Sequence, residues 1–247
     1  MSQRPRIVAI IQARMGSSRL PGKVLLDLAG EPMLARVVNR VRRAPSLDEV
    51  LIATTTEPAD DPLAALCDAR GWPCCRGSRD DVLDRYYRAA QEFGAGVVVR
   101  ITSDCPMIEP EVIDRVVREL LDRRPPPDYA SNVLPRRTYP RGLDVEAFRF
   151  ETLERMWQED DNPAWREHVT QFLVHHPERF VIHNVLDDQD LSAMRWTVDT
   201  PEDLEFVRLI YGGFGHDRFS RQDVLALLEA QPQWLELNRG VQQKVVS

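Results

Sequence analysis

The chain has 247 residues, enough for one large α/β domain or two small ones with a sizeable core. Hydrophobic residues make up 43% of the chain and charged residues 29%, which are ordinary values for a globular protein and exclude an intrinsically disordered one. The formal net charge of −7 argues against a nucleic-acid partner, because proteins that bind a phosphate backbone generally present a basic surface. No stretch is long and apolar enough to span a membrane, so we expect no membrane partner.

Cysteine usage and the amino-terminal segment both favour a cytoplasmic protein. The apolar run that follows the basic residues 1–6 is interrupted by Gln12 and Arg14, which leaves it too short for a secretion signal. The cysteines show no C-x-x-C spacing, so we expect reduced thiols and no structural zinc site. They are Cys67, Cys74, Cys75 and Cys105.

Short apolar runs alternate with amphipathic stretches in the first half of the chain. The pattern predicts strands at residues 7–11, 49–55, 72–75 and 97–101, and helices at residues 32–43, at 60–70, and from an N-cap at Ser78 to Phe93. Because strands and helices alternate, we expect an α/β fold with a mainly parallel central sheet and right-handed crossovers.

A proline-rich segment at residues 123–128 separates two halves of what we expect to be a single domain. We expect residues 212–247 to form a C-terminal helical extension. The second half predicts strands at residues 129–133, 143–148, 180–185 and 195–198, and helices at residues 151–158, 163–175, 201–211 and 220–229, with Thr200 as the N-cap of the helix that begins at Pro201.

The segment that follows the first strand has the composition of a phosphate-binding loop. Its sequence from Arg14 to Lys23 is R-M-G-S-S-R-L-P-G-K, which places three cations, two glycines and two hydroxyls in one short turn. It also lies at the carboxyl end of a strand, where open α/β sheets bind their ligands. Because Arg can bind phosphate oxygens bidentately, the loop is suited to a polyphosphate.

Two common phosphate-binding loops do not match this segment. Five residues separate Gly16 from Gly22 and Val24 follows Lys23, whereas a Walker A loop has four residues between its glycines and a Ser or Thr after its Lys. The Rossmann G-x-G-x-x-G spacing is absent as well. A solvated basic loop is the alternative, although such a loop does not require this order of residues.

Two aspartates follow predicted strands at other points of the chain. Asp104 comes after the strand at 97–101, and Asp199 comes after the strand at 195–198. A carboxylate at such a position is suited to Mg²⁺, which takes one or two carboxylates together with phosphate oxygens and water. The alternative for Asp104 is a turn residue or a helix cap. Capping explains Asp199 less well, because Thr200 already occupies that N-cap.

The loop and its flanks resemble a known family. The run I-I-Q-A-R-M-G-S-S-R-L-P-G-K-V-L, from Ile10 to Leu25, and G-E-P-M-L, from Gly30 to Leu34, resemble the opening of the sugar-acid cytidylyltransferases, and most closely their SpsF (spore-coat polysaccharide) branch. That family is related to the CMP-keto-deoxyoctulosonate and CMP-sialate synthetases. The resemblance implies a GT-A-like, three-layer nucleotidyltransferase fold, with a nucleotide-binding half at residues 1–124 and a sugar-binding and dimerisation half at residues 125–211.

The activity implied by this resemblance is the transfer of CMP from CTP to a sugar or sugar acid, with release of pyrophosphate, for surface polysaccharide or glycoconjugate biosynthesis. It also implies a Mg²⁺ cofactor and a homodimer. The expected mechanism is in-line attack of a sugar oxygen on the α-phosphorus, with catalysis by positioning and charge neutralisation.

The resemblance further implies roles for the loop and for the two aspartates. Asp104 and Asp199 would hold Mg²⁺. The residue before Asp104 is Ser103, as in the SpsF branch, whereas the keto-deoxyoctulosonate enzymes have Gly at that position. Arg14 and Lys23 would act in catalysis as pyrophosphate departs. The residues expected to bind the triphosphate are Arg14, Gly16, Ser17, Ser18, Arg19 and Lys23.

Arg76 and Arg85 lie in a region that resembles the base-contacting segment of this family. Asp80 and Asp81, between them, are able to accept a hydrogen bond from an exocyclic amine. Ion pairs between residues i and i+4 on a helix surface explain the same residues equally well.

Two motifs in the second half resemble those of the SpsF branch, Y-P-R-G-L-D-V-E-A-F at residues 139–148 and R-E-H-V-T at residues 166–170. Their charges suit an acidic or phosphorylated sugar. For His168 the alternative is a residue on a helix surface. The candidates for substrate binding are Arg141, Asp144, Glu146, Arg166 and His168.

Two other functions stay open from the sequence. A GT-A glycosyltransferase that uses a nucleotide sugar usually carries an Asp-x-Asp metal motif, whereas Thr102 and Pro106 stand on either side of Asp104 here. A non-catalytic nucleotide-binding module is the second alternative, against which two carboxylates suited to a metal argue.

Overall fold

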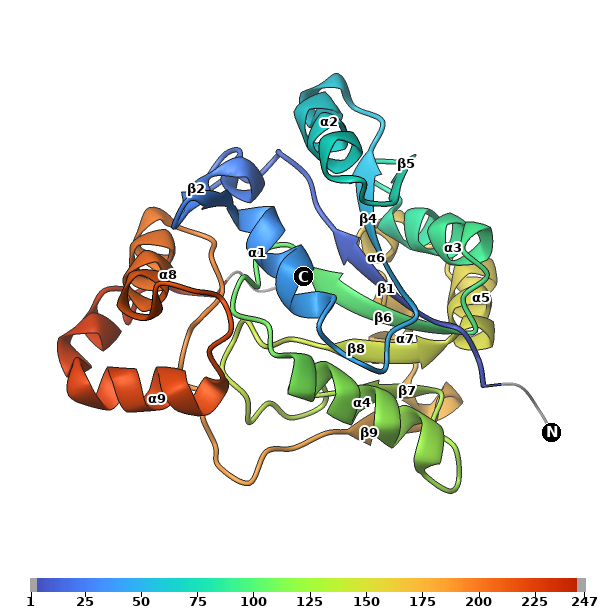
Figure 1. The fold of residues 1–247 in the computed structure, drawn as a ribbon. Coiled ribbons are helices and arrows are strands. Elements are labelled where there is room, and N and C mark those ends of the chain that lie inside the picture. The colour runs from blue at the N-terminus through green and yellow to red at the C-terminus, as the bar shows by residue number, and fades with distance from the viewer. Residues whose placement is uncertain (1–3, 244–247) are drawn as a thin grey trace.

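A seven-stranded sheet forms the centre of this computed structural model, which describes residues 4–243 (Figure 1). The strands lie in the order β5-β4-β1-β6-β8-β7-β9. Their bounds are β1 Ile7–Gln12, β4 Glu49–Thr55, β5 Cys74–Gly77, β6 Val97–Thr102, β7 Tyr129–Ser131, β8 Glu146–Arg149 and β9 Ile182–Asn184. A separate antiparallel pair, absent from the sequence-based prediction, consists of β2 (Asp27–Leu28) and β3 (Glu31–Pro32).

Helices cover both faces of the sheet. The α-helices of the described residues are α1 Met33–Val41, α2 Asp61–Arg70, α3 Val82–Glu92, α4 Pro110–Asp122, α5 Phe150–Glu159, α6 Pro163–Arg166, α7 Gln171–His175, α8 Pro201–Phe214 and α9 Arg221–Ala230. Short 3₁₀-helices occur at Lys23–Leu25, Pro58–Asp60, Pro177–Arg179 and Pro232–Glu236. Among these described residues, none of the helices combines the length and the apolar character needed to traverse a bilayer.

The prediction of a mainly parallel sheet is confirmed. Strands β5, β4, β1 and β6 pair in parallel, while β8 runs antiparallel between β6 and β7. In the register of β1 and β6, Gln12 is opposite Thr102. The loop after β1 and the loop after β6 therefore leave the sheet at the same edge, which brings Arg14–Lys23 and Asp104 to one side of the molecule.

Alternate residues of β1 pack into two apolar layers, one on each face of the sheet. Ile7, Ala9 and Ile11 belong to the layer that includes buried residues of α1, α4 and α8. Val8 and Ile10 belong to the layer that includes residues of α3, α5 and β8. Because β1 is buried on both faces, its sequence is a continuous apolar run rather than an alternating one.

Three predictions of local structure are wrong. Residues 195–198 do not form a strand. They make one isolated β-bridge, from Arg195 to Arg141, and Val198 N donates a hydrogen bond to Asp104 O in the loop after β6. The helix predicted at 163–175 is two short helices, and at the break the buried Thr170 donates its hydroxyl hydrogen bond to Glu146. Ser78 is not the N-cap of α3, because Asp81 accepts the capping bond from Asp84 N–H.

Strands from both predicted halves belong to one sheet, since β7, β8 and β9 continue it beyond β6. The segment after α8 packs back onto this body, and residues of α9 share the core layer that contains α1. The division at residues 124 and 211 stays a prediction.

Gly142 allows the loop before β8 to pack against residues 196–197. Its φ of +104° lies in the region that favours glycine, and a Cβ there would come within 2.5 Å of Thr197 N and 2.6 Å of Trp196 C. We expect Gly142→Ala to lower the free energy of unfolding by about 2–4 kcal/mol, from both backbone strain and overlap. Urea denaturation measures this.

Gly212 in α8 provides the matched control, because a Cβ there meets no atom within 4 Å. Gly212→Ala should change stability by no more than about 1 kcal/mol, and in the stabilising direction, since Ala is the better helix former. Equal effects of the two substitutions would contradict the steric argument.

Candidate active site

The loop that follows β1 is folded back on itself by hydrogen bonds to one carbonyl. Met15 O accepts from Ser17 N at 2.9 Å and from Gly22 N at 3.0 Å. Gly22 has a φ of +69°, which turns the chain into the 3₁₀-helix that begins at Lys23. Leu20 N donates to Ser17 Oγ at 3.3 Å, so that this hydroxyl keeps its own proton free for an acceptor.

Asp60 anchors the loop from outside, and the sequence analysis did not single it out. It is 3% exposed, accepts from Met15 N at 2.6 Å, and also accepts from the hydroxyl of Thr55. A carboxylate that accepts backbone N–H and hydroxyl bonds near a loop fixes the position of that loop. Its only signal in the sequence is an acidic residue in a helix start, which is too common to identify this role.

Asp104 and Asp199 come together because the backbone carbonyl of Asp104 accepts hydrogen bonds from the two residues that precede Asp199. The carbonyl of Asp104 accepts from Val198 N at 2.9 Å and from Thr197 Oγ1 at 3.0 Å. The N-cap of α4 is Glu109, so Asp104 does not cap that helix. Its carboxylate instead accepts from Thr102 Oγ1 at 2.5 Å.

Lys23 lies between the two carboxylates. Its Nζ is 2.8 Å from Asp199 Oδ1, 3.4 Å from Asp104 Oδ2, and 2.7 Å from the carbonyl oxygen of Val198. Lys23 is 8% exposed. Burial lowers the pKa of its ammonium group, but the charges of Asp104 and Asp199 outweigh this effect and raise the pKa above its ordinary value.

Two arginines bind the other oxygen of Asp199. Nη2 of Arg19 and Nη2 of Arg195 each lie 2.9 Å from Asp199 Oδ2. Burial raises the pKa of Asp199, but Lys23, Arg195 and Arg19 together lower it below its ordinary value. The carboxylate is therefore held in its ionised form, as a metal ligand requires.

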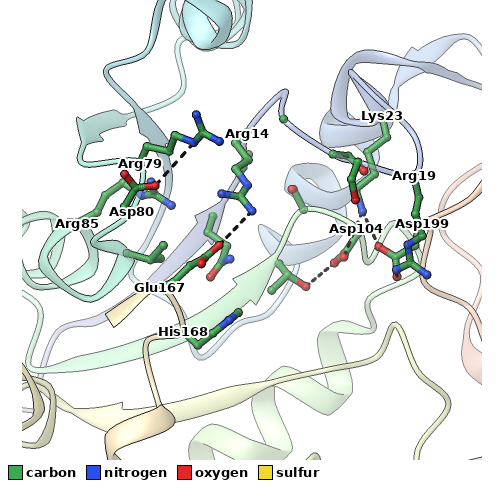
Figure 2. A pocket seen from close by; sticks show the side chains of 18 residues that line it. Arg14, Arg19, Lys23, Arg79, Asp80, Arg85, Asp104, Glu167, His168 and Asp199 are labelled. Carbon is green, nitrogen blue, oxygen red and sulfur yellow. Dashed lines mark hydrogen bonds and ion pairs between the residues drawn. The ribbon is translucent and has the colours of Figure 1, made fainter. Parts of the chain in front are cut away.

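These groups open into one cavity of about 560 Å³ (Figure 2). Lys23, Arg19, Asp104 and Asp199 form one side of it, and Arg14, Arg79, Arg85 and Glu167 lie on the opposite side. The lining residues are Gln12, Ala13, Arg14, Gly16, Ser17, Ser18, Arg19, Lys23, Arg79, Asp80, Val82, Arg85, Thr102, Ser103, Asp104, Glu167, His168 and Asp199. The loop and both aspartates, far apart in sequence, thus line the same cavity.

Arg85 is buried at the wall of this cavity. It is 3% exposed, its Nη1 donates to Ser78 O at 2.7 Å, and its Nε has no hydrogen-bond partner among the described residues. Burial lowers the pKa of Arg85. Arg79 and Asp80 line the same wall and form an exposed ion pair at 3.8 Å.

His168 and Glu167 reach the cavity from the segment that joins α6 to α7. Arg14 Nη2 lies 3.5 Å from Glu167 Oε1 across the opening, and Arg14 is thereby on the far side from Lys23. Burial lowers the pKa of the His168 imidazole, which favours its neutral form. Neither Arg79 nor Glu167 was expected from the sequence, because both lie in ordinary charged segments.

Several of the predicted site residues do not line the cavity. Arg76 instead pairs with Asp61 at 2.7 Å, away from Arg85. Asp81 caps α3 and pairs with Arg166 at 2.8 Å. Neither member of that pair lines the cavity.

The motif at residues 139–148 is likewise engaged inside the protein. Asp144 accepts a two-pronged bond from Arg137, at 2.5 and 2.8 Å. Glu146 accepts from Arg100, Tyr129 and Thr170 in a buried network. Arg141 is tied to the 194–196 segment through its backbone. Asp144, Glu146 and Arg141 therefore do not line the cavity, contrary to the expectation that they bind the substrate.

The carboxylates of Asp104 and Asp199 fit a magnesium ion. Both reach the same small cation, the Lys23 ammonium group, and both offer the hard oxygen donors that Mg²⁺ prefers. Within residues 4–243 no group of three or more His, Cys, Asp or Glu side chains gathers to hold a metal. The protein would thus supply two ligands, and phosphates and water the others.

Comparisons with known proteins identify the family of this chain. The family model of the cytidylyltransferases matches residues 8–231. The spore coat polysaccharide biosynthesis protein SpsF of Bacillus subtilis is 32% identical over 236 residues, which cover 92% of this chain and 95% of that protein. A 3-deoxy-manno-octulosonate cytidylyltransferase of Anaeromyxobacter is 42% identical over 118 residues, 47% of each chain.

The solved structure of a cytidylyltransferase from Leptospira borgpetersenii matches 98% of this chain and all of its own, with a TM-score of 0.90 and 29% identity. The residues matched by the family model include the loop after β1 and both aspartates. The chain belongs to the cytidylyltransferase family.

Proposed function

We propose that this protein is a Mg²⁺-dependent enzyme that transfers CMP from CTP to a sugar acid and releases pyrophosphate. One observation carries the proposal: a cationic loop and two aspartates that are distant in sequence line a single cavity large enough for a nucleotide. Asp104 and Asp199 would hold Mg²⁺, which when bound would supply positive charge that offsets the charge repelling the nucleophile. The remaining roles belong to side chains of this chain.

The triphosphate would lie along the loop. Ser17 and Ser18 offer hydroxyl donors, and Gly16 leaves open space above the backbone, since a Cβ there would meet no atom within 4 Å. Arg19 is 30% exposed at its side chain, so it is able to turn from Asp199 to a phosphate. Lys23 would stabilise the charge that develops on the departing pyrophosphate.

The base would lie at the opposite wall, against Arg85 and Asp80. Arg85 has a buried Nε without a partner, which favours an acceptor from the ligand. The i,i+4 ion pair weighed above does not form between Asp81 and Arg85, because Asp81 pairs with Arg166 and Arg85 Nη1 donates to Ser78 O at 2.7 Å. Arg14 lies on this opposite side as well, paired with Glu167 at 3.5 Å, and would reach the phosphates from there.

The acceptor sugar would enter beside His168. The names of the relatives, a polysaccharide biosynthesis protein and a sugar-acid cytidylyltransferase, support an acidic sugar that is used in surface polysaccharide or glycoconjugate synthesis. Asp144, Glu146 and Arg166 would build this part of the wall, and Arg141 would hold it to the Asp199 segment.

The family supports this function over the two alternatives. A GT-A glycosyltransferase consumes a nucleotide sugar, whereas cytidylyltransferases start from CTP. A non-catalytic module would not need two carboxylates suited to a metal. The proposal includes a homodimer formed through residues 125–211 and a cytoplasmic location, with which the free cysteines agree.

Pyrophosphate release tests the reaction directly. On mixing with CTP, Mg²⁺ and a panel of sugar acids, we expect pyrophosphate to form only when an acceptor is present, as a coupled phosphatase assay measures. A thermal-shift panel of ATP, CTP, GTP and UTP with Mg²⁺ should show the largest rise in Tm with CTP. Hydrolysis of a nucleotide sugar without consumption of CTP would instead indicate a glycosyltransferase.

Replacement of the buried ammonium group tests the role of Lys23. We expect Lys23→Met to lower kcat/KM at least about 100-fold, because an electrostatic contact of the transition state is lost. Two carboxylates would then repel each other without the cation between them, so added Mg²⁺ should raise the Tm of the variant more than that of wild type.

Arg115→Met is the control, since Arg115 pairs with Tyr139 and Leu186 away from the cavity. It should retain wild-type kcat/KM. Unchanged kcat/KM in a folded Lys23→Met variant would remove Lys23 from the mechanism.

A further inference from the structure

Arg195 differs from the other cations around Asp199, because its guanidinium group is also bound by a buried carboxylate, that of Asp203. It is 8% exposed and does not line the cavity. Its Nε lies 2.8 Å from Asp203 Oδ1 and its Nη2 lies 2.9 Å from Asp203 Oδ2, a two-pronged arrangement. The same Nη2 reaches Asp199 Oδ2 at 2.9 Å. One guanidinium group therefore joins a buried carboxylate to the proposed metal ligand.

Asp203 is a rigid base for this arrangement. It is fully buried, and its Oδ2 also accepts from the backbone N–H of Asp199 at 3.0 Å and of Thr200 at 3.1 Å. Asp203 is the third residue of α8 and completes the capping box with Thr200. The same carboxylate thus fixes the start of the helix, the backbone of Asp199 and the arginine that binds the Asp199 side chain.

The C-terminal segment closes the network from the other side. Asn238 is 5% exposed and its Nδ2 donates to Arg195 O at 2.9 Å and to Asp203 Oδ1 at 3.1 Å. Gln243 Oε1 accepts from Arg195 Nη1 at 2.6 Å. Both residues lie beyond residue 231, where the family match ends. Every prong of the Arg195 guanidinium therefore has a partner that holds it in place.

We propose that Arg195, held by Asp203 and Asn238, is a positioning residue that fixes the Asp199 carboxylate for the metal. Arg19 is exposed enough to leave Asp199 when phosphates enter, whereas Arg195 stays, because leaving would strand the buried Asp203. Oδ2 is thereby kept on Arg195 and Oδ1 is directed into the cavity. The inference rests on the proposed function, since it concerns the metal carboxylate of the same site.

The test measures CTP binding by isothermal titration calorimetry without an acceptor, in EDTA and in Mg²⁺. The variant Arg195→Met/Asp203→Asn removes the clamp without leaving a buried unpaired charge. We expect CTP affinity in EDTA to be unchanged, because Arg195 does not line the cavity, and the gain in affinity on adding Mg²⁺ to fall about tenfold, equivalent to about 1.4 kcal/mol. A merely structural role would weaken binding equally in both conditions.

Arg195→Lys is the second variant, for the case in which the double variant does not fold. It keeps the charge but has one ammonium group in place of the planar fork, so the Mg²⁺-dependent gain should again fall. The matched control is Arg43→Met/Asp217→Asn, which removes a comparable pair, 2.8 Å long and remote from the cavity, and should keep the wild-type gain.

The outcomes separate the two proposals. If wild type does not bind CTP, both the proposed function and this inference are overturned. If wild type shows a Mg²⁺-dependent gain and a folded Arg195 variant shows the same gain, the positioning role alone is overturned, and the proposed function stands.

Discussion

The structure depends on the burial of one ammonium group between two carboxylates. Lys23 brings a charge into a site where it is 8% exposed, and such burial is costly unless the charge is paired and hydrogen-bonded. Asp104, Asp199 and the carbonyl of Val198 meet that requirement together. Because these partners come from the end of β6 and from the segment before α8, a single ion cluster holds three distant parts of the chain at one edge of the sheet.

The segment that carries Asp199 has no strand partners and is positioned by other means. It is fixed by the carbonyl of Asp104, by the close approach of Gly142, and by Asp203 at the start of α8. An irregular segment with several such anchors is able to direct a side chain into a cavity as firmly as a strand does. This explains how an aspartate 95 residues from Asp104 in sequence serves the same site.

The sequence was informative wherever function left a local pattern. The apolar run of β1, the Gly-Ser-Arg-Lys composition of the loop and the N-cap at Thr200 each follow from neighbouring residues, and each was predicted. Contacts between distant residues leave no such pattern. Asp60, Arg195 and Asn238 are ordinary polar residues in sequence, and only the fold brings them to the loop and to Asp199. Arg76 and Asp81 show the converse, because a suggestive local pattern led to residues that are paired elsewhere.

The charge of the cavity bears on the form in which a nucleotide would bind. Its lining carries five cationic groups, from Arg14, Arg19, Lys23, Arg79 and Arg85, and four carboxylates, from Asp80, Asp104, Glu167 and Asp199. Such a nearly balanced site offers little net attraction to a free triphosphate, because four of the five cations, all except Arg85, already pair with a carboxylate. With Asp104 and Asp199 holding a divalent cation, Lys23 and Arg19 would be free to bind the phosphates. Metal and nucleotide would therefore favour each other's binding. The net negative charge of the protein would not prevent it from binding a triphosphate, because only Lys23 and Arg19 would need to move from carboxylates to phosphates.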